Sequence, residues 1–295
     1  MRILLTGATG QVGRTLLPIL TKDHDVIAPG RDVLDLGKSG AVRNVMRDVK
    51  PEVVINSGAW TAVDLAESRE TEATAVNAGA VAILGEEAKN TGARIIHFST
   101  DYVFDGEKQG PYAETDTPNP MSAYGRGKLA GEQALVASGA NHVILRLSWV
   151  YATEGQNFAK TILRLAQERD TLSIVADQIG APTPASLAAE VTCLLLTRKD
   201  VSGIFHLSPA GATSWHGYAQ FLLTEAQKRG MAFKTGPEAL VAIPSADYKQ
   251  AARRPKNSIL DTALLRQALG IKLPDWRQGV VSLLDLIAAG NNNAL

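Results

Sequence analysis

Short apolar runs alternate with longer segments of helical spacing through the first half of the chain, and this alternation restricts the fold more than any other feature. Strands that are apolar on both faces are typical of parallel sheets covered by helices on both sides. The sequence therefore predicts an α/β protein with a doubly wound parallel sheet, the Rossmann architecture, over residues 1–150. The expected strands are RILLT (2–6), DVIA (25–28), VVIN (53–56), RIIHFS (94–99) and VILRLS (143–148).

The regular alternation is lost after residue 150. The segments SIVADQIGAPTPAS (173–186) and GIFHLSPAGATSWHGYA (203–219) contain short strands interrupted by Gly, Pro, Ser and Thr. We expect a smaller, mixed α/β lobe made of residues 151–184 and 209–295. A segment near 185–208, with GIFHLS as its strand, is expected to return to the main sheet.

Composition limits the classes of partner. The 295 residues include thirty Lys and Arg against thirty Asp and Glu, without a run of like charges. Such a balance argues against a nucleic-acid or membrane-surface partner. The single cysteine, Cys193, cannot form an internal disulfide. A strand and a glycine turn fill the first ten residues, and no stretch reaches the ~18 apolar residues of a membrane span. We therefore expect a cytoplasmic protein.

Three glycines follow the first expected strand directly, in LLTGATGQVG. Gly7, Gly10 and Gly13 allow a tight turn and a close backbone approach, and the N-terminus of the following helix offers free N–H groups to a pyrophosphate. The spacing G-x-x-G-x-x-G differs from the commoner G-x-G-x-x-G. Its place in the first strand–helix turn of an α/β pattern favours dinucleotide binding over a plain turn.

The end of the second expected strand bears on the choice between NAD and NADP. An acidic residue there binds a ribose 2′-hydroxyl, whereas an arginine pairs with a 2′-phosphate. The sequence has APGRD, with Arg31 followed by Asp32. Arg31 favours NADPH, and the neighbouring Asp32 keeps NADH possible.

A tyrosine and a lysine stand four residues apart in SAYGRGKLAGEQAL. On a helix, Tyr124 and Lys128 lie on one face. A nearby ammonium favours the phenolate, so Lys128 is expected to lower the pKa of Tyr124 toward the range of an acid–base catalyst. Most Tyr-x-x-x-Lys pairs are solvated surface pairs. Gly125 and Gly127 weaken the helix start without a folding benefit visible in the sequence, which favours close approach of a ligand.

Polar residues gather where the strand 94–99 ends, in STDYVFDG (99–106). Ligands of a doubly wound sheet bind outside the carboxyl ends of its strands. Thr100 is therefore expected to face the same crevice as the glycine turn. Together Thr100, Tyr124 and Lys128 would form a proton-donating triad beside a bound nicotinamide.

With these residues in this order, the chain resembles the extended short-chain dehydrogenase/reductase superfamily, and within it the dTDP-4-dehydrorhamnose reductase family, from residue 1 to about 280. The resemblance implies hydride transfer from NAD(P)H to the 4-keto carbon of dTDP-4-dehydro-6-deoxy-L-mannose, giving dTDP-L-rhamnose. It also makes the second lobe the substrate-binding lobe. The blocks that carry it are STDYVFDG, YGRGKLAGE (124–132), SWVYATEGQNFAKTILRLA (148–166), DQIGAPT (177–183) and ARRPKNS (252–258).

The resemblance also assigns roles to individual positions. Tyr124 would be the proton donor, Lys128 would hold the nicotinamide ribose, and Thr100 would orient the keto group. The cofactor would further contact Gly10, Gln11 and Val12 at the pyrophosphate, Asp35 and Leu36 on the adenine side, and Ala59, Trp60 and Thr61 at the far edge of the cleft. The sugar nucleotide would contact Asp101, Tyr102 and Trp149.

Other positions carry open alternatives. Arg253 and Arg254 suit a diphosphate, and equally a salt-bridged loop that closes against the sheet. Some relatives form a metal-linked dimer through a glutamate at the position of Thr15, so we expect a monomer or weak homodimer. No metal is expected, because the five histidines lack ligand spacing and suit ordinary core or surface positions. They are His24, His97, His142, His206 and His216.

Two alternative functions share this scaffold. A nucleotide-sugar epimerase uses its cofactor transiently, and a dehydratase places Asp-Glu after the threonine, where this chain has Asp101-Tyr102. A non-catalytic protein like the regulatory β subunit of methionine adenosyltransferase has no need of Thr100, Tyr124 and Lys128 together. Both alternatives stay open on the sequence alone, and a reductase is favoured.

Overall fold

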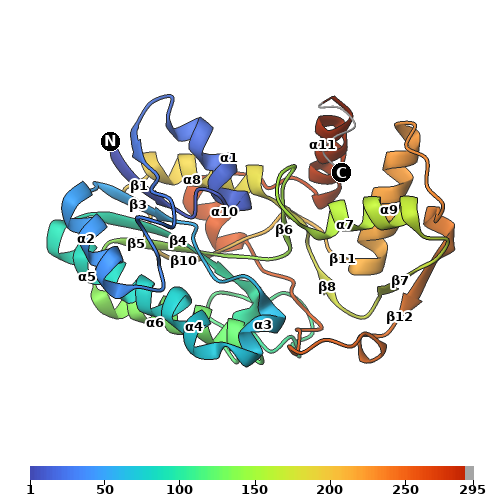
Figure 1. Ribbon diagram of the computed structural model, residues 1–295, viewed down its shortest axis with the longest axis horizontal. Coiled ribbons are helices and arrows are strands. Elements are labelled where there is room, and N and C mark those ends of the chain that lie inside the picture. The colour runs from blue at the N-terminus through green and yellow to red at the C-terminus, as the bar shows by residue number, and fades with distance from the viewer. Residues whose placement is uncertain (290–295) are drawn as a thin grey trace.

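A six-stranded parallel sheet forms the centre of the larger part of the molecule (Figure 1). The computed structural model describes residues 1–289. The strand order is β10-β5-β4-β3-β1-β2, so the chain builds outward in both directions from β1 and β3. The predicted doubly wound sheet is confirmed, as is the return of GIFHLS beside β5. The strands are β1 (Arg2–Thr6), β2 (Asp25–Ile27), β3 (Val53–Asn56), β4 (Arg94–Thr100), β5 (His142–Leu147) and β10 (Gly203–Leu207).

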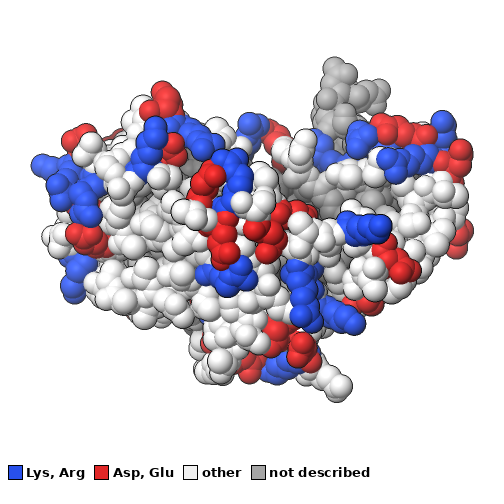
Figure 2. All heavy atoms as spheres, turned by 60° about the horizontal axis from the view of Figure 1, so that its bottom comes forward, with Lys and Arg blue, Asp and Glu red and all other residues white. Residues whose placement is uncertain are grey.

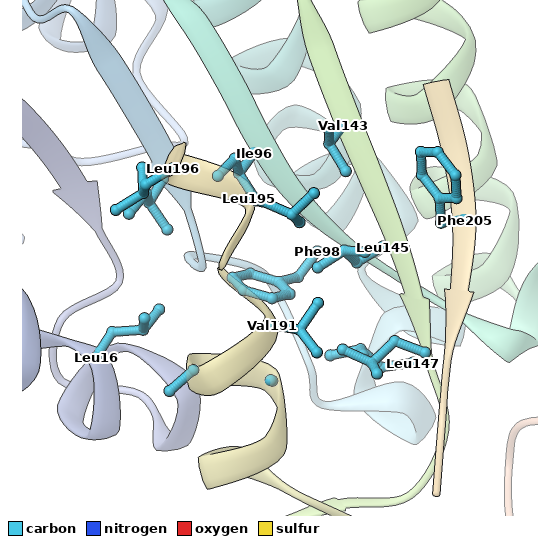
Figure 3. Packing of buried hydrophobic residues seen from close by; sticks show 14 of the residues in the cluster. Leu16, Ile96, Phe98, Val143, Leu145, Leu147, Val191, Leu195, Leu196 and Phe205 are labelled. Atoms are coloured by element: carbon cyan, nitrogen blue, oxygen red, sulfur yellow. The ribbon is translucent and has the colours of Figure 1, made fainter. Parts of the chain in front are cut away.

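Helices cover both faces of this sheet (Figure 1). One face packs on α1 (Gln11–Leu20), α8 (Ala185–Thr197) and α10 (Ala263–Leu269). Figure 3 shows Phe98 of β4 and Leu145 of β5 directed toward Val191 of α8. The other face packs on α2 (Ser39–Val49), α5 (Ala80–Thr91) and α6 (Ala123–Ser138). Because successive strand residues point to opposite faces, continuous apolar strands such as VVIN supply both cores.

Short helices cluster beside α6, near the C-terminal end of β4. They are α3 (Val63–Ser68), α4 (Glu70–Thr74), the π-helical turn η1 (Ala75–Gly79) that leads into α5, and the 3₁₀ turn η2 (Asp101–Val103). All of them contact α6. They determine where the side chains of α6 lie relative to the end of the sheet.

A second core forms around α7 (Phe158–Glu168), α9 (Trp215–Lys228) and α11 (Trp276–Ala289) (Figure 1). The expected division into two lobes stays a prediction, with one correction. Leu265 of α10 packs in the core of the main sheet, so the range 209–295 does not belong wholly to the second lobe; residues 290–295 lie outside the described part.

The short strands outside the main sheet form three pairs. They are β7 (Leu172–Val175) with β12 (Leu240–Ile243), β8 (Ile179–Gly180) with β11 (Thr213–Ser214), and β6 (Val150–Tyr151) with β9 (Thr183–Pro184). The 3₁₀ turns η3 (Pro237–Ala239) and η4 (Ser245–Asp247) flank β12.

Positive and negative side chains lie side by side on the face shown in Figure 2, as the balanced composition predicts. Within residues 1–289, no helix is long and apolar enough to cross a membrane. The same residues contain no cluster of three or more His, Cys, Asp or Glu side chains suited to a metal ion.

Candidate active site

The glycine turn has the geometry that a dinucleotide requires. Gly7 has φ of +66°, and a Cβ there would lie 2.5 Å from the Cα of Gly58. A Cβ on Gly13 would lie 2.2 Å from the Gly7 carbonyl oxygen, so neither position admits a side chain. Gly10 is the N-cap of α1 and places no side chain over the helix start. The first N–H groups of α1 therefore remain available to an anion, which fits the pyrophosphate of a dinucleotide.

A cavity of about 190 Å³ adjoins this turn. The side chain of Arg31 is 85% exposed, and its Nε lies 3.9 Å from Asp35 Oδ1, so the guanidinium is free to meet a phosphate. Of the predicted cofactor residues, those lining the cavity are Gly7, Arg31, Asp35, Leu36, Ala59 and Trp60. The sequence analysis assigned no role to several other lining residues, among them Thr6, Thr9, Leu34, Gly58 and Val76.

The remaining predicted residues of the cofactor cleft do not line this cavity. Val12 packs against the core of the main sheet, and Gly10 and Gly13 build the turn itself. Thr61 is exposed. Gln11 joins the turn to the start of α7, because its Oε1 accepts a hydrogen bond of 2.9 Å from Asn157, the N-cap residue of that helix.

Thr100 and Tyr124 meet at the carboxyl end of β4, as the sequence predicts. Thr100 is the last residue of β4 and is buried. Tyr124 lies in the first turn of α6, which Ser122 caps by accepting a 3.1 Å hydrogen bond from Gly125 N. Burial raises the pKa of the Tyr124 phenol to about 12, while a hydrogen bond with Thr100 acts in the opposite direction. The expected lowering of this pKa is therefore wrong, because desolvation of the phenolate dominates.

Lys128 lies one turn further along α6 and is 2% exposed. Its Nζ donates a 2.6 Å hydrogen bond to the Phe98 carbonyl oxygen and lies 3.3 Å from His97 Nε2. Burial lowers the pKa of Lys128 to about 8, with Glu132 opposing that effect. This amine therefore loses its proton at a lower pH than an exposed lysine does.

Two further side chains complete the site around Tyr124. The rings of Tyr102 and Tyr124 meet edge to face, with centroids 5.7 Å apart. Asp101 is 3% exposed; its Oδ1 accepts a 3.1 Å hydrogen bond from Thr100 Oγ1, and its Oδ2 has no hydrogen-bond partner. Burial raises the pKa of Asp101 to about 7, against hydrogen bonds that lower it. Burial also raises the pKa of Tyr102.

The glycines of α6 serve the packing of the chain against itself, which corrects the expectation of a ligand there. A Cβ on Gly125 would lie 2.3 Å from the Tyr102 carbonyl oxygen, and one on Gly131 would lie 2.1 Å from the Asn77 carbonyl oxygen. At Gly127 the nearest atom would be 3.5 Å away, an ordinary contact. Gly125 thus permits η2 to lie directly on α6, and this contact sets the position of Tyr102.

The two arginines of ARRPKNS differ in their surroundings. Arg254 pairs with Asp64 of α3, 190 residues earlier, at 2.7 Å, and also contacts Tyr102. Arg253 is exposed and lines a cavity of about 1010 Å³ together with Lys249, Lys256 and Arg254. Arg254 therefore fastens the loop to α3 while it also lines this cavity, and the expected contact of either arginine with a diphosphate stays a prediction.

Trp149 packs against the second core in a strained conformation. Its φ of +47° is unusual for a residue other than glycine, and its ring stacks on Trp215 with centroids 3.6 Å apart. Trp215 and Phe158 line a cavity of about 720 Å³. Arg254 and Tyr248 line both this cavity and the one of about 1010 Å³. One face of the Trp149 ring is covered by Trp215 and its edge packs on Gly180.

Several site residues were missed by the sequence analysis. Asn56 ends one apolar strand and His97 interrupts another. These polar residues could have marked both as members of a buried polar network. Asp64 and Trp215 carry no such signal, because only the tertiary structure brings them to Arg254 and Trp149.

Comparison with known proteins agrees with this geometry. A family model described as the RmlD substrate binding domain matches residues 1–288. A dTDP-4-dehydrorhamnose reductase of Burkholderia thailandensis is 43% identical over 288 residues, which cover 95% of this chain and 97% of that protein. One of Escherichia coli K12 is 43% identical over 293 residues, with 97% of each chain covered.

Solved structures give the same result. The crystal structure of dTDP-4-dehydrorhamnose reductase from Bacillus anthracis, in complex with NADP, superposes with a TM-score of 0.91 at 31% identity and covers 97% of this chain and 99% of that one. The predicted resemblance is confirmed, and the chain belongs to the dTDP-4-dehydrorhamnose reductase family of oxidoreductases.

Proposed function

We propose that the protein reduces the 4-keto group of dTDP-4-dehydro-6-deoxy-L-mannose to give dTDP-L-rhamnose, with NADPH as the favoured and NADH as a possible reductant. The observation that carries this proposal is the meeting of Thr100 and Tyr124 at the end of β4, with Lys128 one helical turn away on α6. The full-length relatives named as reductases support it, as does the NADP bound to the B. anthracis relative.

The cofactor site is assigned to the glycine turn and the small cavity beside it. The N-terminus of α1 would hold the pyrophosphate, Arg31 the 2′-phosphate of NADPH, and Asp35 and Leu36 the adenine side. Lys128 would hold the nicotinamide ribose. A reduced nicotinamide bound there supplies a hydride to the keto carbon. The remaining chemistry falls to the residues of the chain.

Tyr124 is assigned as the proton donor to the forming alcohol. The phenol is protonated at neutral pH, as an ordinary tyrosine is, and burial raises its pKa further. The proton is therefore available when charge develops on the keto oxygen. Thr100 would orient that oxygen beside the phenol. Asp101, Tyr102 and Trp149 are placed toward the sugar, and Arg253 toward the diphosphate in the large cavity. The second lobe would thus bind the substrate.

A reduction assay tests this proposal. Purified protein is mixed with the dTDP-4-keto-6-deoxy sugar and NADPH, and loss of reduced-nicotinamide absorbance is followed. One NADPH consumed per product formed indicates a reductase; turnover without net consumption indicates an epimerase, and no turnover indicates a binding protein. In Tyr124→Phe we expect kcat to fall by about 10²–10⁴ with NADPH affinity unchanged. A wild-type rate would remove Tyr124 from the mechanism.

A further inference from the structure

A line of four buried polar side chains crosses the sheet from the small cavity to the candidate catalytic lysine. Thr6 of β1 donates a 2.6 Å hydrogen bond to Asn56 Oδ1 of β3, and Asn56 Nδ2 lies 2.9 Å from His97 Nδ1 of β4. His97 Nε2 lies 3.3 Å from Lys128 Nζ. All four side chains are at most 2% exposed. We call Thr6, Asn56, His97 and Lys128 the buried polar chain.

The direction of the hydrogen bonds follows from the two ends of the Asn56 amide: its Oδ1 meets Thr6, and its Nδ2 meets His97. Thr6 Oγ1 accepts a 3.1 Å hydrogen bond from Gly58 N, so its own proton is available to Asn56. The 2.6 Å separation suits an O–H···O bond, and the 2.9 Å separation between Asn56 and His97 suits an N–H donor. The amide nitrogen of Asn56, Nδ2, therefore donates to His97 Nδ1. A neutral imidazole that accepts at Nδ1 carries its proton on Nε2.

This tautomer points an N–H group at Lys128 Nζ. An uncharged amine has a lone pair that accepts this proton, whereas an ammonium has only donors. A doubly protonated ring is no alternative, since burial and the nearby lysine hold the pKa of His97 well below its usual value. The buried polar chain therefore discriminates between the two charge states of Lys128.

We propose that His97 is a positioning residue for Lys128: held by Thr6 and Asn56, its Nε2 proton stabilises Lys128 as an uncharged amine. The proposal deepens the proposed function, on which it rests for the role of Lys128. It also links that role to the cofactor cavity, because Thr6 and Gly58 line it.

Other charged groups on the elements packed against α6 do not account for this effect. Glu132, on α6, favours the ammonium and is itself paired with Arg146 of β5 at 2.6 Å. Three further carboxylates have other partners: Glu67 of α3 accepts from Ala123 N, Glu70 of α4 pairs with Arg126, and Glu87 of α5 pairs with Arg43 and Arg47. Asp101 of η2 lies at the Tyr124 end of α6, where it accepts from Thr100 beside Tyr102 and Tyr124.

The charge state of Lys128 can be measured directly by NMR in the full-length protein without cofactor or substrate. Lysine is labelled with ¹³C at Cε, the Lys128 signal is assigned by its loss in Lys128→Met, and its pKa is read from a pH titration. In His97→Asn, which keeps an acceptor near Nδ1 but does not reach Lys128, we expect the pKa to rise by about one unit, the worth of one buried hydrogen bond. In His97→Gln, whose amide nitrogen reaches the Nε2 position, we expect a value close to wild type.

A third variant tests the far end of the buried polar chain. Thr6→Val preserves the volume and lies two side chains away from Lys128, so water cannot enter beside the amine. Because Asn56 is then free to turn over, we expect the Lys128 pKa to rise here as well. An unchanged pKa in His97→Asn or in Thr6→Val, or equal shifts in His97→Asn and His97→Gln, would overturn the proposal. The titration is independent of turnover, so a protein that fails the reduction assay still shows whether His97 controls the charge of Lys128.

Discussion

A fully buried ion pair fastens α6 to the sheet one helical turn beyond Lys128. Arg146 of β5 and Glu132 of α6 are 2% and 1% exposed. The guanidinium donates to both carboxylate oxygens, with Nε to Oε1 at 2.9 Å and Nη2 to Oε2 at 2.6 Å. Ser99 donates a further hydrogen bond to Oε1, and Phe104 covers the guanidinium with its ring. Both charges are therefore paired and removed from water.

This geometry predicts that removing one charge of the pair destabilises the protein more than removing both. Glu132→Leu leaves the guanidinium of Arg146 buried without its counter-charge, which costs about 3–5 kcal/mol of unfolding free energy. At ~2–4 °C per kcal/mol, the melting temperature should fall by on the order of 10 °C. The double variant Glu132→Leu/Arg146→Met replaces both charges with apolar groups of similar volume. Its stability should lie close to that of the wild type, or above it.

Differential scanning calorimetry at neutral pH compares these variants. The half-exposed pair of Arg164 and Glu168 provides a control, since Arg164→Gln should change the melting temperature by no more than ~1–2 °C. The reasoning is refuted if Glu132→Leu costs no more than this control. It is also refuted if the double variant is as unstable as Glu132→Leu, since the cost would then come from packing and not from an unpaired charge.

Three other outcomes are expected. In urea unfolding, Gly125→Ala should lower the free energy of unfolding by about 1–3 kcal/mol, because its Cβ meets a backbone carbonyl oxygen at 2.3 Å. Gly127→Ala should raise it by up to ~1 kcal/mol through helix propensity. Equal effects of the two substitutions would contradict the packing argument. Burial raises the pKa of Asp64, but hydrogen bonds, of which that from Arg254 is the largest, lower it by more. The ion pair therefore stabilises the folded protein above the ordinary carboxyl pKa. This stabilisation is lost as the pH falls through the lowered pKa. Melting temperatures of wild type and Asp64→Asn should thus differ at pH 7 and converge as the pH falls below the ordinary carboxyl pKa; a constant difference would exclude the ion pair as its source. In direct binding measurements, Arg31→Ala should weaken NADPH more than NADH, and equal weakening would reject contact with a 2′-phosphate.

Much of the larger lobe follows from local pattern. The continuous apolar strands could be recognised because each must be buried on both faces, and their cores on both sides of the sheet bear this out. The glycine turn was equally visible, since Gly7 needs a positive φ and Gly13 a close approach to its own turn. Thr100 could be placed because the carboxyl end of a strand in such a sheet is where ligands bind.

The electrostatics of the site could not be predicted in the same way. The sequence suggested that Lys128 lowers the pKa of Tyr124, but burial of the phenol raises it, and the Lys128 amine instead contacts His97 and the Phe98 carbonyl oxygen. A spacing of four residues shows which helix face two side chains share. It does not show how much water reaches them, and desolvation decides the sign of the shift.

The sequence by itself determined the strands of the main sheet, the first turn and the residues that carry the family resemblance, because each depends on neighbours within a few positions along the chain. Only the tertiary structure decided the close contacts between distant segments, such as Arg254 with Asp64 and Trp149 with Trp215. It likewise decided why Gly125 must be glycine and which partner His97 meets. The physical reason is that burial, dielectric environment and steric fit depend on segments that the folded chain brings together, and no local pattern encodes their proximity.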